Sequence, residues 1–229
     1  MSVAADPALQ RLAARALELV PDGALVGLGA GRAARAFVHA LGERARRGFE
    51  VTGVPASDET AELARRLGIR LAGLGDRPLD LAVDGADEVD PALDLLKGFG
   101  GALTRERIVA AAAQRQVILV GEDKLVPALG SRGRLPVEVL PFALPLVQRR
   151  LAALGLPGAV RTVSGRPFVT DNFNVILDLE VTALEDPRAT DAAIRAVPGV
   201  VDTGLFLGTA GLVLVGTAAG IRELTRAPR

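Results

Sequence analysis

Short apolar runs alternate with helical segments along the first half of the chain, and this alternation limits the fold more than any other feature. The runs are almost entirely apolar, rather than alternately apolar and polar, at residues 24–28, 79–83 and 117–120. Such runs are typical of strands in a parallel sheet that helices cover on both faces. Apolar residues at helical spacing predict helices at residues 7–20, 33–41, 58–67 and 104–113. We therefore predict an α/β fold with a Rossmann-like, mostly parallel sheet covered by helices.

The alternation of strands and helices changes near residues 135–137 and Pro141. Two helices are expected beyond this point, at residues 143–154 and 191–197, with short strands near 159–162 and 174–179. Mixed elements of this kind indicate a small α+β domain. Apolar strands return at residues 204–216. We predict a main Rossmann-like domain of residues 1–130, completed by 205–229, and a smaller α+β domain of residues 131–204.

Composition and charge exclude several classes of function. The 27 basic and 27 acidic side chains give a formal net charge of +0, so no broad field favours nucleic acid or an anionic membrane. No apolar stretch approaches the roughly 18 residues that suggest a membrane span. The N-terminus lacks a secretory-signal pattern. We expect a cytoplasmic protein with neither nucleic acid nor membrane as a partner.

The chain has no cysteine, a single histidine and very few lysines. The chain has no Cys and one His, His39, which we expect on an ordinary helix face. Thiolate chemistry and a multi-His metal site are therefore excluded, and we expect neither a metal nor a cofactor. Lys97 and Lys124 are the only lysines. A lysine can be required where a site needs a compact ammonium group that arginine cannot replace. With only two lysines, their positions can also be due to chance.

A glycine-rich loop follows the first predicted strand, with the sequence Gly27-Leu28-Gly29-Ala30-Gly31-Arg32. Glycines let backbone N–H groups approach an anion, and a helix N-terminus favours negative charge. The loop departs from the dinucleotide fingerprint, because Arg32 stands at a glycine position and no acidic residue closes the second strand. An anion-binding loop and a tight packing turn both stay open as interpretations.

Three further motifs lie at or after later strands. Residues 84–88 (DGADE) place three carboxylates within five positions, which suits acid–base chemistry but also an acidic surface turn. Residues 97–101 (KGFGG) precede a helix whose first turn carries Glu106, either a proton-accepting carboxylate or a complement to the helix dipole. Residues 121–124 (GEDK) are a site loop or a solvated turn. Because ligands bind beyond the carboxyl ends of parallel strands, we expect the loops that start at Gly29, Ser57, Asp84 and Gly121 to converge on one crevice.

Together these motifs resemble the signature blocks of type A ribose-5-phosphate isomerases. The similar segments occur in the family's order and cover nearly the whole chain: AVDGADEVD, KGFGGALTRERI, LPVEVLPFA, VTDNFNVILDL and VPGVVDTGLFLG. The resemblance implies an aldose–ketose isomerase that interconverts D-ribose 5-phosphate and D-ribulose 5-phosphate in the non-oxidative branch of the pentose phosphate pathway. It also implies a smaller α+β (ferredoxin-like) lid domain, no metal, and a homodimer or homotetramer that binds a small-molecule sugar phosphate.

The resemblance also implies roles for individual residues. It makes Glu106 the general base, Asp84 and Asp87 active-site aspartates, and Lys97 a substrate lysine. Lys124 matches a later lysine of the family that contacts the substrate. The substrate-binding residues that it implies are Gly29, Ala30, Gly31, Arg32, Ala33, Asp84, Gly85, Ala86, Asp87, Lys97, Gly98, Phe99, Gly100 and Lys124.

The chain departs from the family at the first loop. The family usually has GTGST there, with hydroxyls that hold the phosphate, whereas residues 29–33 of this chain read GAGRA. We expect Arg32 to replace those hydroxyls; the alternative is that it points to solvent and backbone N–H groups suffice. A lysine often found in the first helix is replaced by Leu9 or Gln10, and the family's TDNGN reads TDNFN at 170–174.

Two other functions stay open at this stage. The altered loop is compatible with a non-catalytic sugar-phosphate sensor on the same fold, although a sensor needs no proton-transfer base such as Glu106. An acyl-group transferase of related architecture is the third candidate, but the motif around its covalent Glu is absent. Turnover of ribose 5-phosphate separates the three.

Overall fold

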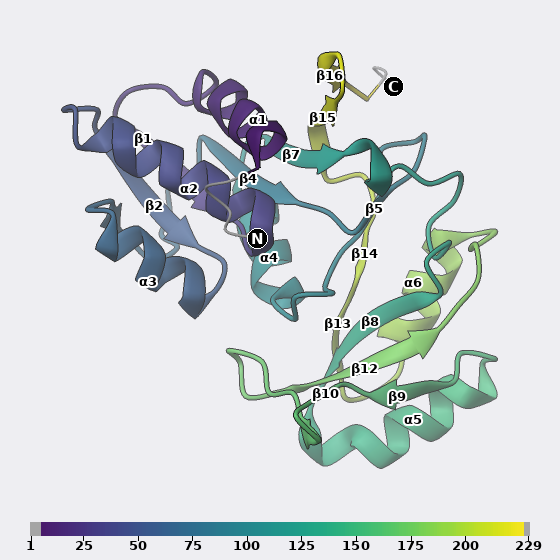
Figure 1. Ribbon diagram of the computed structural model, residues 1–229. Coiled ribbons are helices and arrows are strands. Elements are labelled where there is room, and N and C mark those ends of the chain that lie inside the picture. Colours follow the sequence, from purple (N-terminus) through teal and green to yellow (C-terminus); the bar gives the residue numbers. More distant parts are fainter. Residues whose placement is uncertain (1–5, 227–229) are drawn as a thin grey trace. The chain divides into compact units, whose positions relative to one another are not determined.

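The computed structural model describes residues 6–226 of the 229-residue chain. These residues form two compact units, each treated separately below (Figure 1). Unit 1 comprises Met1–Ala86, Arg105–Lys124 and Thr209–Arg229, and unit 2 comprises Asp87–Thr104 and Leu125–Gly208. The ends of the predicted main domain, residues 1–5 and 227–229, lie outside the described residues.

Unit 1 is built on a seven-stranded sheet with the order β16-β15-β7-β4-β1-β2-β3. All neighbouring strands are parallel except the edge pair of β15 and β16. The strands are β1 (Ala24–Leu28), β2 (Val51–Pro55), β3 (Arg70–Leu71), β4 (Leu81–Gly85), β7 (Gln116–Gly121), β15 (Ala210–Thr217) and β16 (Gly220–Leu224). This sheet confirms the predicted α/β, mostly parallel architecture.

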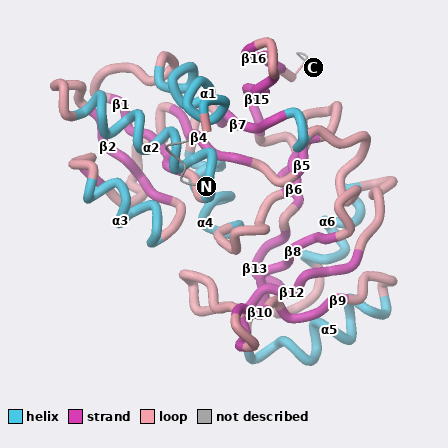
Figure 2. The backbone as a smooth tube through the Cα atoms, viewed as in Figure 1, coloured by secondary structure: helices cyan, strands magenta, loops and turns pink. Residues whose placement is uncertain are grey.

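Helices cover both faces of this sheet (Figure 2). Successive strand side chains point to opposite faces. Leu81 and Val83 of β4 therefore join one cluster with the buried sides of α1 (Pro7–Leu17), α2 (Gly31–Ala45) and α3 (Asp58–Arg66). Between them, Ala82 joins a second cluster with Val109 of α4 (Leu103–Ala112). The continuous apolar runs of the sequence are thus explained by burial on two sides.

Unit 2 contains a four-stranded antiparallel sheet with the order β13-β8-β12-β9. In chain order, helix α5 connects β8 to β9, and helix α6 connects β12 to β13. This is the ferredoxin-like βαββαβ connection. Both helices bury side chains against the same face, where one apolar cluster includes Val147, Leu151 and Ile194. The elements are β8 (Arg134–Val139), α5 (Leu144–Ala153), β9 (Gly158–Val160), β12 (Val175–Glu180), α6 (Pro187–Arg195) and β13 (Val200–Thr203).

Residues 87–104 group with unit 2, whereas the sequence pattern placed all of residues 1–130 in the main domain. The strands β5 (Glu88–Val89) and β6 (Leu95–Leu96) form a small sheet with β14 (Leu205–Phe206), in the order β14-β6-β5. The carboxylate of Glu88 also accepts the N–H groups of Gly130 and Arg132, at 2.6 and 2.8 Å. Strands of two residues carry no readable period, so this pairing was invisible in the sequence.

Other predicted elements differ from the observed ones mainly at their ends. The first helix stops at Leu17 rather than at residue 20, and the last begins at Pro187 rather than at 191. Asp186 caps that last helix by accepting the N–H groups of Arg188 and Ala189. An acidic cap before a proline at the first helical position is a start signal that the apolar spacing alone did not include. Among residues 6–226, no helix has the length and apolar character needed to cross a membrane.

Asp80 ties the starting ends of two central strands of unit 1 together. Its Oδ2 accepts the N–H of Leu25 at 2.7 Å and a hydrogen bond from Arg77 at 2.8 Å. The Leu25 hydrogen bond, with a smaller contribution from Arg77, holds the pKa of Asp80 below its ordinary value. A carboxyl with a lowered pKa stabilises the fold above its ordinary pKa, and this contribution is lost as the pH falls through the folded-state pKa.

We therefore predict that Asp80→Asn lowers the free energy of unfolding by about 1 kcal/mol at neutral pH. The loss is no larger because the carboxylate is partly exposed and its charge is screened by solvent. The difference from the parent should shrink as the pH falls below about 4. Urea unfolding of both proteins over a pH series measures it. Asp76→Asn, at an exposed position of the preceding loop, is the control and should change little. A difference that stays constant with pH would contradict the assignment.

Candidate active site

The loop between β1 and α2 in unit 1 is held by three backbone and side-chain contacts. Gly29 N–H donates to the carbonyl of Val83 at 2.9 Å, and the Oγ1 of Thr60 donates to the carbonyl of Gly29 at 2.9 Å. The N–H of Ala30 donates to Oδ1 of Asp84 at 3.1 Å. Thr60 is buried and was not identified from the sequence. Two of these contacts join the loop to the carboxyl end of β4, the strand beside β1, and the third joins it to Thr60 of α3.

Asp84 requires glycine at position 29. A Cβ on Gly29 would lie 2.2 Å from the carboxylate of Asp84, which is closer than any side chain can approach. The same Oδ1 that accepts Ala30 N–H also accepts the N–H of Gly85 at 2.7 Å. Asp84 itself is buried, with 3% of its surface exposed. The glycine thus serves close packing as well as loop geometry, and both interpretations of the loop are compatible with the structure.

The start of α2 suits an anion. The helix begins at Gly31, whose φ is +79°, and its N-cap residue, Ala30, has no side chain that could accept the first N–H groups. Unsatisfied N–H groups and the helix dipole favour a negative ligand at such an end. Ala33, in the first turn, lies beside Gly85, because a Cβ built there would be 3.4 Å from that of Ala33. The loops of residues 29–33 and 84–85 are therefore neighbours within unit 1.

The Arg32 side chain is largely exposed to solvent in this structure. Its side chain is 75% exposed, and Nη2 lies 3.4 Å from Oδ2 of Asp6. An exposed pair at this distance is worth little, so it does not fix the guanidinium.

Glu106 and Lys124 complete the unit 1 part of the predicted site. Glu106 lies in the first turn of α4 and is buried, with 6% of its surface exposed. Lys124 ends the short helix η2 (Glu122–Lys124), which follows β7 directly; its Nζ is 4.0 Å from Oδ2 of Asp123. A carboxylate in the first turn of a helix is stabilised in its charged form by the helix dipole.

Ala86 ends a segment of unit 1, and unit 2 holds the other predicted residues, Asp87, Lys97, Gly98, Phe99 and Gly100. The N–H of Phe99 donates to Oδ2 of Asp87 at 2.9 Å, which joins the acidic motif to the glycine loop. The Lys97 side chain is buried, 3% of the residue being exposed, and its Nζ lies 5.6 Å from the ring centroid of Phe206. Gly98 and Gly101 have φ of +105° and +88°, which only glycine adopts easily. Asp87, Lys97 and the glycine loop therefore form one constellation within unit 2.

Buried polar side chains behind this loop were not assigned by sequence reasoning. Glu138, on the sheet face opposite the helices, is fully buried and accepts hydrogen bonds from four side chains. These donors are Thr104, Thr170, Asn172 and Asn174. The two asparagines, which stand alone in the sequence, thus share one acceptor. A charged residue inside the apolar strand sequence LPVEV was the signal that could have identified this cluster.

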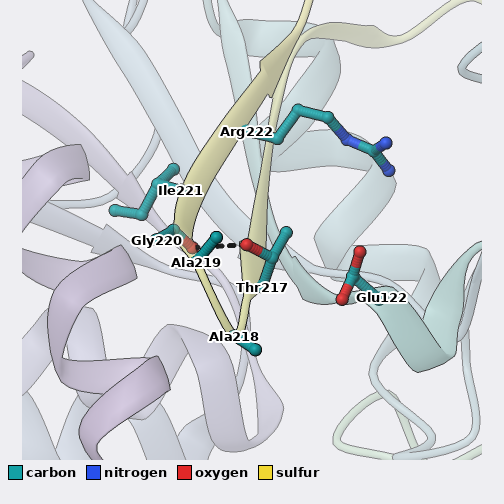
Figure 3. Close-up of a pocket in the computed structure, with 7 residues that line it drawn as sticks. All are labelled: Glu122, Thr217, Ala218, Ala219, Gly220, Ile221 and Arg222. Atoms are coloured by element: carbon teal, nitrogen blue, oxygen red, sulfur yellow. Dashed lines mark hydrogen bonds between the residues drawn. The ribbon is translucent and has the colours of Figure 1, made fainter.

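One surface hollow of unit 1 does not belong to the predicted site. It has a volume of about 430 Å³ and lies between Glu122 and the turn that joins β15 to β16 (Figure 3). Thr217 Oγ1 donates to the carbonyl of Gly220 at 3.2 Å in that turn. None of the predicted site residues lines it.

His39 is exposed on α2, and residues 6–226 contain no group of three or more His, Cys, Asp or Glu side chains placed to hold a metal ion.

Comparisons with known proteins give one consistent result. The family model for ribose 5-phosphate isomerase A (phosphoriboisomerase A) matches residues 52–220. Ribose-5-phosphate isomerase A of Roseiflexus sp. (strain RS-1) is 52% identical over 219 residues, covering 94% of each chain.

Two solved structures agree with it. Ribose 5-phosphate isomerase A of Methanocaldococcus jannaschii has a TM-score of 0.91 and 38% identity, covering 95% of this chain and 98% of its own. A D-ribose-5-phosphate isomerase in complex with phospho-erythronic acid has a TM-score of 0.92 and 36% identity, and the match covers 99% of this chain and 100% of its own. Because the family model spans most of the chain and the relatives match over nearly their whole length, the chain belongs to the ribose 5-phosphate isomerase A family.

Proposed function

We propose that the chain interconverts D-ribose 5-phosphate and D-ribulose 5-phosphate through an enediolate, with Glu106 as the base. The observation that carries this proposal is the buried Glu106 carboxylate in a chain that is 52% identical to a ribose-5-phosphate isomerase A. The reaction moves one proton between carbons 1 and 2 of the open-chain sugar. A single carboxylate beside both carbons can remove the proton and return it to the neighbouring carbon.

A cation and N–H donors stabilise the oxyanion that forms in this reaction. We assign this task to the buried Lys97 and to the glycine loop behind it. Two N–H groups of the loop are already occupied, since Phe99 donates to Asp87 and Gly101 donates to the carbonyl of Gly98. The proposal therefore narrows the donors to the N–H groups of Gly98 and Gly100, rather than to all four of residues 98–101.

The two aspartates take different tasks in this proposal. Asp84 accepts two loop N–H groups with one oxygen, so its first task is to hold the phosphate loop. Asp87 uses Oδ2 for Phe99 N–H, and its Oδ1 is assigned to a sugar hydroxyl during ring opening and proton shuttling. The phosphate itself is assigned to the first N–H groups of α2, with Arg32 and Lys124 as cations beside it.

The surroundings of the site are part of the same proposal. Unit 1 is assigned as the catalytic Rossmann-like domain and unit 2 as the lid. The loops that start at Gly29, Ser57, Asp84 and Gly121, all in unit 1, are expected to converge on one crevice. We propose a homodimer or homotetramer without metal or cofactor, located in the cytoplasm. Light scattering of the purified protein gives its mass, and a monomeric mass would contradict the assembly. Cell fractionation tests the location.

The first prediction separates an isomerase from a non-catalytic sensor. Purified protein incubated with ribose 5-phosphate should produce ribulose 5-phosphate, and exhaustive treatment with EDTA should leave the rate unchanged. The physical reason is that soft metal ligands are nearly absent, with one His and no Cys in the chain. Loss of turnover in EDTA that Mg²⁺ or Mn²⁺ restores would contradict the metal-free mechanism, and binding without turnover would favour the sensor.

The base assignment predicts that Glu106→Gln folds and binds ribose 5-phosphate but has a kcat lower by about 10²–10⁴-fold, because the amide cannot accept the proton. Steady-state kinetics and a thermal melt measure both parts. Glu62→Gln, an exposed carboxylate on α3, is the matched control and should keep the parent kcat. A kcat of Glu106→Gln within a few-fold of the parent means that another group is the base.

The phosphate assignment predicts that Arg32→Ala raises KM for ribose 5-phosphate about tenfold or more, since a charged hydrogen bond is worth about 1.5–3 kcal/mol. The fall in kcat should be smaller, because phosphate contacts change little between ground and transition states. Arg35→Ala is the control: Arg35 lies in the same helix and pairs with Glu59 at 2.9 Å. An unchanged KM in Arg32→Ala would show that backbone N–H groups suffice.

A further inference from the structure

The side chain of Arg161 binds backbone carbonyl groups of the glycine loop of unit 2, residues 98–101. Its Nη1 donates to the carbonyl oxygens of Gly98 and Phe99, at 2.9 and 3.0 Å. The side chain is largely buried, with 10% exposed. One guanidinium nitrogen therefore holds two consecutive carbonyl groups of the loop that follows Lys97.

The guanidinium is itself held in place by β12. Nε and Nη2 of Arg161 both donate to the carboxylate of Asp178, the first at 2.9 Å and the second at 2.5 Å. The backbone of Arg161 is also fixed, since its N–H donates to Ile176 O and its carbonyl accepts the N–H of Phe168, both at 2.8 Å. Two parallel charge-assisted bonds to one carboxylate set the plane of a guanidinium. Arg161 is thus a rigid donor rather than a flexible side chain.

This contact sets the direction of two N–H groups on the other side of the loop. In a trans peptide the C=O and N–H point to opposite sides, and the described chain has no cis peptide bond. Because the carbonyl of Gly98 faces Arg161, the N–H of Phe99 points away from it, where Asp87 accepts it. Because the carbonyl of Phe99 also faces Arg161, the N–H of Gly100 points away as well. Gly100 is an exposed residue.

A loop with three glycines needs such a contact. Gly98, Gly100 and Gly101 lack the side chains that restrict backbone rotation, so their peptide planes turn at little cost. Phe168 fixes one end, because its ring lies where a Cβ on Gly101 would be, at 2.4 Å. Arg161 holds the peptide plane between Phe99 and Gly100, and it adds to the contacts of Asp87 and of Gly101 N–H on the plane between Gly98 and Phe99.

We propose that Arg161 is a positioning residue of the isomerase: by holding Gly98 O and Phe99 O it presets the Gly100 N–H and Asp87 for the enediolate. The proposal rests on the proposed function, which assigns the oxyanion to this loop. Donors that are aimed before charge develops stabilise the transition state more than the ground state. Loss of Arg161 should therefore lower kcat rather than raise KM.

The test is Arg161→Met, which keeps an unbranched apolar stem in place of the arginine side chain and removes all its donors. We expect kcat to fall by about 10–100-fold while KM for ribose 5-phosphate changes by less than about threefold. The inhibition constant of phospho-erythronic acid should rise with the fall in kcat, because its carboxylate places negative charge where the enediolate carries it. Arg161→Lys should recover part of the loss, since one ammonium can reach one carbonyl but cannot also form the paired contact with Asp178.

Arg134→Met is the matched control. The Arg134 guanidinium lies 3.9 Å over the ring of Phe99 and 3.8 Å from Asp178, so it contacts the same loop and the same carboxylate, and it should keep kcat within about twofold. A folded Arg161→Met with parent kcat, or with equal rises of KM and the inhibition constant, overturns the proposal. If Arg161→Met does not fold, Asp178→Asn decides in its place, because it loosens the anchor and keeps Arg161.

Glu106→Gln measured in parallel separates this proposal from the proposed function. If Glu106→Gln loses turnover and Arg161→Met keeps it, the positioning role alone is wrong. If both keep turnover, the proposed site fails, and the role of Arg161 fails with it.

Discussion

The contact between the Asp84 carboxylate and the loop at Gly29 is the constraint on which the unit 1 site depends. One oxygen accepts the N–H groups of Ala30 and Gly85, so it joins the carboxyl ends of two adjacent parallel strands. The carboxylate lies so close that position 29 admits no side chain. A buried charge is tolerated only with hydrogen-bond partners, and two of the partners here are the backbone N–H groups of Ala30 and Gly85. Charge burial and loop geometry are therefore a single requirement.

In unit 2 a buried cation, the guanidinium of Arg161, holds the backbone of a glycine-rich loop. Its glycine loop offers carbonyl groups to Arg161 and one N–H to Asp87, while Asp178 balances the guanidinium. Glycine-rich loops are soft, which lets the backbone approach a ligand but leaves the peptide planes poorly fixed. Buried charged side chains restore the order without blocking the approach. In both units, then, a carboxylate that the sequence motifs highlight accepts backbone N–H groups: Asp84 in unit 1 and Asp87 in unit 2.

Local sequence predicted those parts of the molecule that depend on local signals. Strand β1 lies at the residues predicted, because an apolar run ending in glycines is readable by itself. Asp84 and Lys97 were also singled out from the local sequence motifs that contain them, and their roles stay predictions. By contrast, the grouping of residues 87–104 with unit 2 depends on pairing with β14, more than a hundred positions later. Arg161 was missed for the same reason: among many arginines, only its distant partners distinguish it.

The departure at Phe173 shows how a buried network can carry a local cost. The family pattern has glycine there, and in this chain Phe173 takes a φ of +62°, which costs a residue with a side chain about 1 kcal/mol or more. Its N–H donates to the carbonyl of Thr170, whose hydroxyl accepts the N–H groups of Asn172 and Asn174. These three side chains all donate to the buried carboxylate of Glu138. The turn is therefore set by Glu138, and the exposed Phe173 ring is tolerated because it takes no part in the network.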